Sequence, residues 1–205
     1  MVLHSHGRLA SKYDSLSGDI SANVRLTALN LFVAHGYQAV GLRQIAQGVG
    51  LKPGYLYNRI EGKEYLLFEL IHDFEQELSR GVKQAIARER SQRKKLMAFV
   101  SEYTEFSLLN RDLHTLAIRE GHSLVGSFRD KIYSLRNFRL NLLKGIAARE
   151  CCEHGVKQTY RDLACEAVIA MLSGMLVDRR SDAQSGSMQR VAGDMAIKIL
   201  CGSNG

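Results

Sequence analysis

The sequence predicts an all-α protein in which a small N-terminal head of three helices precedes a larger helical domain. Apolar residues recur at steps of three and four through most of the 205 residues, and no stretch alternates apolar and polar residues as a strand would. Proline occurs only at Pro53, so long uninterrupted helices can form elsewhere. The expected parts are a mobile arm at 1–18, the head at 19–64 and the larger domain at 65–205.

The first helix of the head is expected over 19–35. Ile20, Val24 and Phe32 share one face of a helix with 3.6 residues per turn. Gly36 follows directly and is a common helix terminator. This helix is expected to brace the two that come after it.

The next stretch has the pattern of a helix followed by a tight turn. Leu42, Ile45 and Val49 recur at helical spacing. Gly50 stands where the residue after a helix often needs positive φ. Pro53 then suits the first position of another helix, because its φ is already close to the helical value.

The second short helix is expected to run from about Pro53 to Arg59. Leu56 and Ile60 point back onto the preceding helix, whereas Tyr55 and Asn58 lie on the outward surface. Apolar anchors, a turn glycine and an outward polar face at this spacing describe a DNA-binding helix-turn-helix. An ordinary helical hairpin in a protein core is the alternative.

The same residues carry a resemblance to a known family. The pattern is IA-x-x-x-G-x-x-x-G-x-L-Y followed by K-E, which here comprises Ile45, Ala46, Gly50, Gly54, Leu56, Tyr57, Lys63 and Glu64. It resembles the tetracycline-repressor (TetR) family of one-component regulators. The resemblance implies a DNA-binding head, a helical domain that binds a small effector, and a homodimer on a double-stranded DNA operator.

Four positions depart from the family pattern. Gly41 stands where a Ser or Thr usually caps the helix, a change worth about 1 kcal/mol in typical hosts. Lys52 replaces the usual Ser or Thr before the recognition helix, Tyr55 replaces a small polar residue, and Ile60 replaces an aromatic. These changes affect base preference and phosphate contacts more than they affect the motif.

Tyr55, Asn58 and Arg59 are expected near base edges, because Asn pairs with adenine and Arg with guanine through two hydrogen bonds each. Lys52, Tyr57 and Lys63 are expected on phosphates. The full set of predicted DNA-binding residues is Arg43, Gln44, Lys52, Pro53, Gly54, Tyr55, Tyr57, Asn58, Arg59 and Lys63.

The larger domain is expected to begin with a long helix from Lys63 to about Ile86, which links the two domains in the family. Its end merges into a basic run, 83–95, for which a solvated helix end is preferred to a second DNA site. Further helices are expected over 96–109, 112–120, 125–154, 159–177 and 188–201, with a loop over 181–187.

Bulky side chains on three neighbouring helices are candidates for an effector pocket, because bundle interiors often hold small ligands. The candidates are Phe99, Tyr103, Phe106, Phe128, Ile132 and Phe138. Each of them also suits a plain core position. Four arginines on the same helices suit an anionic head group, such as an acyl-CoA phosphate, or simply surface charge; they are Arg119, Arg129, Arg136 and Arg139.

Composition limits the remaining functions. The net charge of +7 suits a phosphate-rich partner. No apolar run is long enough for a membrane span, and a cytoplasmic location is expected. Cys151, Cys152, Cys165 and Cys201 lack metal-ligand spacing and are expected to be free thiols. The histidines are scattered and no catalytic motif is present, so neither a cofactor, nor a metal, nor an enzymatic activity is expected.

The expected function is a transcriptional regulator, a repressor that leaves a palindromic operator when a small amphiphile binds. The alternative is a constitutive DNA-binding protein without an effector. Helices near 159–177 and 188–201 are expected to pair with their copies across a two-fold axis, because the first is apolar around most of its circumference. Ala167, Ala170 and Gly174 would form its low packing ridge.

Overall fold

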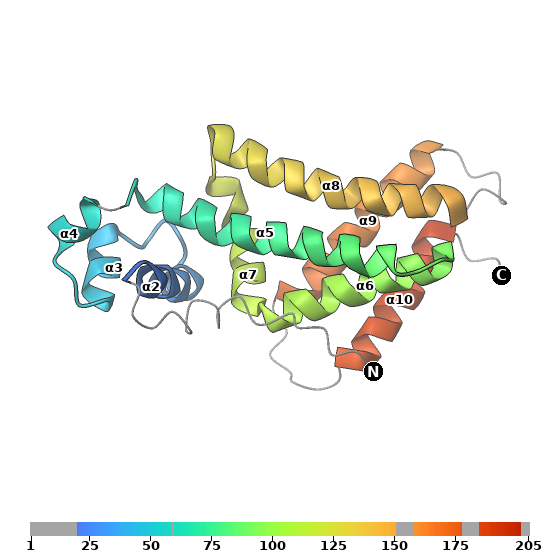
Figure 1. Cartoon of the computed structure of the whole chain (residues 1–205), viewed down its shortest axis with the longest axis horizontal. Coiled ribbons are helices and arrows are strands. Elements are labelled where there is room, and N and C mark those ends of the chain that lie inside the picture. The colour runs from blue at the N-terminus through green and yellow to red at the C-terminus, as the bar shows by residue number, and fades with distance from the viewer. Residues whose placement is uncertain (1–19, 59, 151–157, 178–184, 202–205) are drawn as a thin grey trace. The chain divides into compact units, whose positions relative to one another are not determined.

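The computed structural model describes residues 20–58, 60–150, 158–177 and 185–201, and within these ranges all regular elements are helices (Figure 1). The predicted arm at 1–18, Arg59, Cys151, Cys152 and the expected helix end at His154 lie outside the described residues. The helices are α2 (Ile20–His35), α3 (Leu42–Gly48), α4 (Pro53–Tyr57), α5 (Lys63–Ala87), α6 (Gln92–Leu109), α7 (Arg111–Glu120), the 3-10 helix η1 (Gly121–Ser123), α8 (Gly126–Glu150), α9 (Gln158–Val177) and α10 (Ser185–Cys201).

The prediction of an all-α fold is confirmed, and most helix ends fall close to their expected positions. Gly36 ends α2 with φ of 81°, and its N–H donates to Phe32 O at 2.9 Å. Two expectations were wrong. The loop predicted over 181–187 is too long, because α10 already begins at Ser185, and the second helix of the motif ends at Tyr57 rather than at residue 59.

The chain forms two compact units. The first unit comprises the residues up to Phe74 together with Leu109–Ile132, and the second comprises Glu75–Leu108 together with the chain from Tyr133 on. Helices α5 and α8 therefore each contribute to both units. The functional boundaries predicted at 18 and 64 stay predictions, because compactness alone does not say which residues act together.

The core of the first unit is formed where α2 packs against α3 and α7. Ala28, Phe32 and Ile45 are each at most 1% exposed. Burial of a side chain as large as Phe32 or Ile45 contributes about 1.5–3 kcal/mol. A Cβ atom at Gly48 would lie 2.7 Å from Thr27 Cγ2, so the absence of a side chain there allows α3 to lie close to α2.

The second unit has an apolar interior drawn from α5, α6, α8, α9 and α10. Its most buried large side chains include Leu78, Phe99, Leu143 and Leu172. Helices α9 and α10 pack against each other. No helix in the described part of the chain combines the length and the hydropathy needed to cross a membrane.

Candidate nucleic-acid interface

The turn after α3 is closed by two backbone hydrogen bonds. Gly50 has φ of 72°, its N–H donates to Gln47 O at 3.0 Å, and the N–H of Leu51 donates to Ala46 O at 2.9 Å. This pair of bonds is a Schellman motif, in which a residue with positive φ follows the helix. The role predicted for Gly50 is confirmed, and the motif fixes the direction in which the chain leaves α3.

Helix α4 begins as predicted, with Pro53 as its first residue and Lys52 as its N-cap. Lys52 has extended backbone (φ −67°, ψ 134°) and makes no side-chain capping bond, so its ammonium group is not used to start the helix. Leu56 is 2% exposed and anchors the helix to the core. Asn58 is the C-cap and is exposed.

The start of α3 uses Gln44 in place of the missing serine or threonine. The N-cap, Gly41, has no side chain to accept a bond, but its own N–H donates to Gln44 Oε1 at 2.7 Å. This is one half of a capping box. Gln44 therefore has a structural role at the position where a DNA contact was predicted.

Most of the predicted DNA-binding residues on α3 and α4 are exposed to solvent. Tyr57 is 58% exposed and Tyr55 is 37% exposed. Pro53 is half-buried, and a Cβ atom at Gly54 would meet nothing within 4 Å. The exposed members of the set are Arg43, Gln44, Lys52, Gly54, Tyr55, Tyr57 and Asn58, whereas Arg59 lies outside the described residues.

Lys63, the first residue of α5, contacts the loop between α2 and α3. Its Nζ donates to Tyr37 O at 2.9 Å and lies 4.2 Å from the centre of the Tyr37 ring. Glu120, at the end of α7, accepts a hydrogen bond from the Tyr37 N–H at 3.1 Å. Two side chains from distant positions thus hold the peptide groups that precede α3, a feature that sequence reasoning missed.

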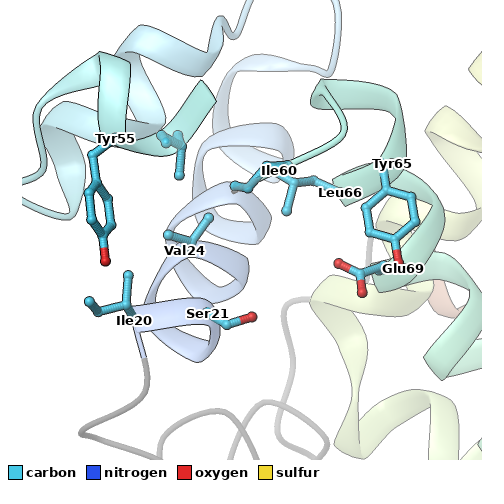
Figure 2. A pocket seen from close by; sticks show the side chains of 9 residues that line it. Ile20, Ser21, Val24, Tyr55, Ile60, Tyr65, Leu66 and Glu69 are labelled. Carbon is cyan, nitrogen blue, oxygen red and sulfur yellow. The ribbon is translucent and has the colours of Figure 1, made fainter. Parts of the chain in front are cut away.

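Tyr55 borders a pocket inside the first unit. The pocket has a volume of about 390 Å³ and is lined by Ile20, Ser21, Val24, Tyr55, Leu56, Ile60, Tyr65, Leu66 and Glu69. Figure 2 shows the Tyr55 hydroxyl directed toward Ile20 on α2. The pocket includes Ile60, where the family more often has an aromatic ring. Tyr55 therefore lies over this pocket as well as at the surface of α4.

An ion pair lies beside this pocket. Arg25 Nη2 is 2.5 Å from Glu69 Oε1, and the two side chains are 27% and 19% exposed. Arg25 of α2 is joined in this way to Glu69 of α5. The bond links the first helix of the head to the first half of α5.

The six residues predicted to line an effector pocket are divided between the two units. Phe128 and Ile132 belong to the first unit, where Phe128 stacks on Phe68 with ring centres 4.5 Å apart. In the second unit Phe99, Tyr103 and Phe106 are buried on α6, whereas Phe138 of α8 is 39% exposed. The three from α6 are side by side, and Phe99 and Tyr103 stack with ring centres 6.4 Å apart.

Two of the four arginines considered for an anionic head group share one carboxylate within the chain. Glu75 pairs with Arg136 Nε at 2.6 Å and with Arg139 Nη2 at 2.5 Å. The side chains of Glu75 and Arg139 are 2% and 4% exposed. Arg119 and Arg129 are exposed, and Arg129 lies 3.6 Å from Asp130.

Comparisons with known proteins agree with this geometry. Residues 26–70 match the model of the bacterial regulatory proteins of the tetR family. No curated protein sequence matches the chain. Among solved structures, the TetR-family regulator PfmR from Thermus thermophilus has a TM-score of 0.75 at 23% identity, with 89% of this chain and 99% of that one covered.

Two further structures carry ligands. FadR from Bacillus subtilis, in complex with stearoyl-CoA, has a TM-score of 0.68 at 17% identity and covers 89% of this chain and 98% of its own. AibR, in complex with isovaleryl coenzyme A and operator DNA, has a TM-score of 0.73 at 16% identity and covers 87% and 96%. Residues 26–70 therefore match the helix-turn-helix model of the tetR family, and the described part of the chain has the fold of solved TetR-family regulators.

Proposed function

We propose that the protein is a homodimeric repressor that binds a palindromic operator through α3 and α4 and leaves it when a small amphiphile binds. The observation that carries the proposal is the two-sided character of the motif. Ile45, Ala46 and Leu56 are buried, while the polar side chains of α3 and α4 face solvent. A short helix held in this way can enter the major groove with its outward side chains against base edges.

Within the proposed interface, Asn58 and Tyr55 read bases, and Lys52, Tyr57 and Arg43 contact phosphates. Asn58 lies at the end of α4, and its side-chain amide can donate and accept toward adenine. The ammonium of Lys52 is exposed at the other end. Arg59, outside the described residues, completes the proposed base-reading set, and Pro53 and Gly54 keep the start of α4 narrow.

The geometry around Lys63 supports a positioning role in addition to the predicted phosphate contact. Its bond to Tyr37 O, with the bond from Tyr37 N–H to Glu120, holds the loop from which α3 begins. An ammonium group has three N–H donors, so one can still reach a phosphate. The dependence of operator affinity on salt distinguishes the two roles, because only a lost phosphate contact lowers the slope by about one unit.

The proposed dimer uses the exposed face of α9. Tyr160 and Leu163 are 52% and 66% exposed, and Ala167, Ala170 and Gly174 continue the same face at three- and four-residue steps. On α10, Val191 and Met195 are 53% and 41% exposed. Apolar side chains gathered on neighbouring helices are typical of an interface with a second copy.

The proposed effector is an amphiphile because relatives with the same fold, FadR and AibR, were solved with acyl-CoA molecules. Phe99, Tyr103 and Phe106 on α6 are the proposed ligand contacts, with Phe138 of α8, and all four lie in the second unit. Phe128 and Ile132, which the sequence analysis also named, belong to the first unit. The competing proposal is a constitutive DNA-binding protein, which requires no effector.

The deciding experiment selects DNA bound by the purified full-length protein from a random pool. Enrichment of an imperfect palindrome is the expected result, and failure to enrich any sequence contradicts the proposal. Asn58→Ala should change preference at one position by about 1–3 kcal/mol. Asn30→Ala, an exposed change on α2, is the matched control and should leave the preference unchanged.

Assembly is tested by adding charge to α9. Ala170→Glu should yield monomers in light scattering, with helicity kept and operator affinity lost. Gln84→Glu adds the same charge to an exposed site on α5 and should leave the dimer intact. A wild-type chain that binds its operator tightly as a monomer contradicts the interface. Acyl-CoA esters added to the operator complex then separate the effector-responsive regulator from the constitutive one.

A further inference from the structure

Most of the net charge of the chain is concentrated in one short segment. Residues 83–95 hold six cations and one carboxylate, a net charge of +5 out of +7 for the whole chain. The segment covers the last turn of α5, the connection to α6 and the first turn of α6. It lies wholly in the second unit, so it is not part of the helix-turn-helix surface.

A groove of about 350 Å³ opens beside this segment and has two kinds of wall. It is lined from α5 by Lys83, Ile86 and Ala87, from α6 by Gln92 and Lys95, and from α8 by Asn141, Leu142, Gly145, Ile146 and Arg149. The aliphatic members form an apolar strip. The two lysines and the arginine provide three positive charges, and no carboxylate is among these lining residues.

The floor of the groove is accessible and rests on buried side chains. Ile146 is 4% exposed and belongs to the core, whereas Gly145 is exposed. A Cβ atom at Gly145 would meet nothing within 4 Å, so a bound molecule can approach the backbone of α8 there. Lys83 Nζ also lies 5.9 Å from the centre of the Phe138 ring, which keeps this cation beside the apolar surface.

We propose that this groove binds a small amphiphile that carries a phosphate group. Lys83, Lys95 and Arg149 would contact the phosphate, and Ile86, Leu142 and Ile146 would contact the apolar part. A doubly charged phosphate matches three cations better than a single carboxylate does, and arginine donates to phosphate with two parallel hydrogen bonds. The amides of Gln92 and Asn141 supply further polar contacts at the rim.

The apolar strip favours a small molecule over a nucleic acid. A DNA backbone lying on the 83–95 segment would use its cations and leave Ile86 and Leu142 uncovered in the groove. An amphiphile covers both walls at once, because its charge and its hydrocarbon are joined in one molecule. Binding would then depend on the length of the hydrocarbon as well as on charge.

The test measures binding of octyl phosphate, below its micelle concentration, to the full-length wild-type protein by titration calorimetry. Octyl phosphate is expected to bind at least about tenfold more tightly than inorganic phosphate, because its methylene groups become buried against the apolar strip. Octyl glucoside, which has the same hydrocarbon and no charge, should bind much more weakly. Equal affinity for octyl phosphate and inorganic phosphate overturns the proposal.

Two charge-matched double variants locate the site. Lys95→Gln with Arg149→Gln removes two lining cations and should weaken octyl phosphate binding by about tenfold or more, since hydrogen bonds to a charged group are stronger than those between neutral groups. Arg90→Gln with Arg93→Gln removes two exposed cations of the same segment that do not line the groove. If the second double variant loses as much octyl phosphate affinity as the first, binding reflects general charge attraction and the proposal is overturned.

A third variant fills the groove without changing charge. Gly145→Leu places a side chain in open space on α8 and should abolish octyl phosphate binding while the circular dichroism stays that of the wild type. Unchanged affinity in this variant places the ligand elsewhere. Competition by a DNA duplex that displaces octyl phosphate identifies a nucleic-acid surface instead. All these measurements are made without operator, so their failure leaves the proposed regulatory function untouched.

Discussion

The two units of the molecule differ in where they hold their charges. In the first unit the ion pair between Arg25 and Glu69 is 27% and 19% exposed, and water can reach both partners. In the second unit Glu75 and Arg139 are 2% and 4% exposed, and Arg139 also donates to Ser79 Oγ at 2.9 Å. The first unit therefore holds this ion pair where solvent screens it, whereas the second unit holds an ion pair within its interior.

The physical consequence is an unequal sensitivity to single changes. An exposed pair contributes at most about 1 kcal/mol, because solvent screens it and holding two side chains costs entropy. Removing one partner of a buried pair leaves an uncompensated charge in the interior, and this costs about 3–5 kcal/mol. Burial alone disfavours ionisation of Glu75, but the guanidinium groups of Arg139 and Arg136 outweigh it and lower the pKa of the carboxyl.

Among these predictions, Glu75→Ala should produce the largest effect. The change leaves Arg139 buried without its carboxylate and should lower the free energy of unfolding by about 3–5 kcal/mol. The measurement is urea unfolding followed by circular dichroism. Glu77→Ala is the matched control on the same helix, because Glu77 pairs with exposed Arg80 at 2.5 Å, and it should cost less than about 1 kcal/mol. Equal losses of stability in the two variants would contradict the proposed difference between the buried and the exposed ion pair.

Acidic pH should remove part of the stability that the ionised Glu75 carboxylate contributes. Because the folded-state pKa of Glu75 lies below its ordinary value of 4.5, the ionised carboxylate stabilises the fold above pH 4.5, and this stability is lost as the pH falls through the folded-state pKa. The difference in unfolding free energy between wild type and Glu75→Gln should be constant at neutral pH and shrink below pH 4.5. A difference that stays constant to about pH 3 would mean that Glu75 does not titrate in this way.

In the first unit, a substitution that strains the backbone should produce a measurable loss of stability. Gly50→Ala forces a side chain into a positive-φ conformation and should cost about 1–2 kcal/mol of stability, although a Cβ atom there meets nothing within 4 Å. Gly54→Ala also meets no atom, but it lies within α4 and should stabilise by up to about 1 kcal/mol. Thermal unfolding measures both, and a stabilising Gly50→Ala would contradict the assigned turn.

The smallest effect is expected at Cys165, where the rate of thiol labelling, rather than the free energy of unfolding, is the measured quantity. Burial raises the pKa of the Cys165 thiol to about 11. The thiolate, which is the reactive form, is then scarce at neutral pH. Cys165 should react with a water-soluble disulfide reagent only after urea is added, as followed by mass spectrometry. Rapid labelling of this residue in the native protein would show that the interior of the second unit opens readily.

Local signals in the sequence predicted the helix-turn-helix well. Gly36 and Gly50 permit a positive φ and Pro53 fixes its own φ, so their effects on helix ends can be read without knowing the rest of the fold. The end of α4 was placed too late because the helical spacing of apolar residues continues from Leu56 to Ile60, and such spacing does not report where the helical backbone ends.

Two of the missed contacts join residues that are far apart in the chain. Glu120 and Tyr37 are 83 positions apart, and Glu75 and Arg139 are 64 apart. Nothing in the local pattern of either partner indicates the other. Phe128 and Phe138 were placed in one predicted pocket as bulky side chains on neighbouring helices, yet the boundary between the two units falls between them. Helical periodicity identifies a buried face but not the core to which it belongs.

The composition of the first unit bears on the order in which the protein can mature during synthesis. Its helix-turn-helix is complete by Asn58, but Glu120 and the buried residues Leu113 and Leu116 of α7 reach it only after the second unit has been started. A ribosome adds about 5–20 residues per second. Several seconds therefore pass between synthesis of the helix-turn-helix and synthesis of α7, which completes the core of the first unit. A fragment that ends at residue 74 lacks α7 and should remain a substrate for chaperones.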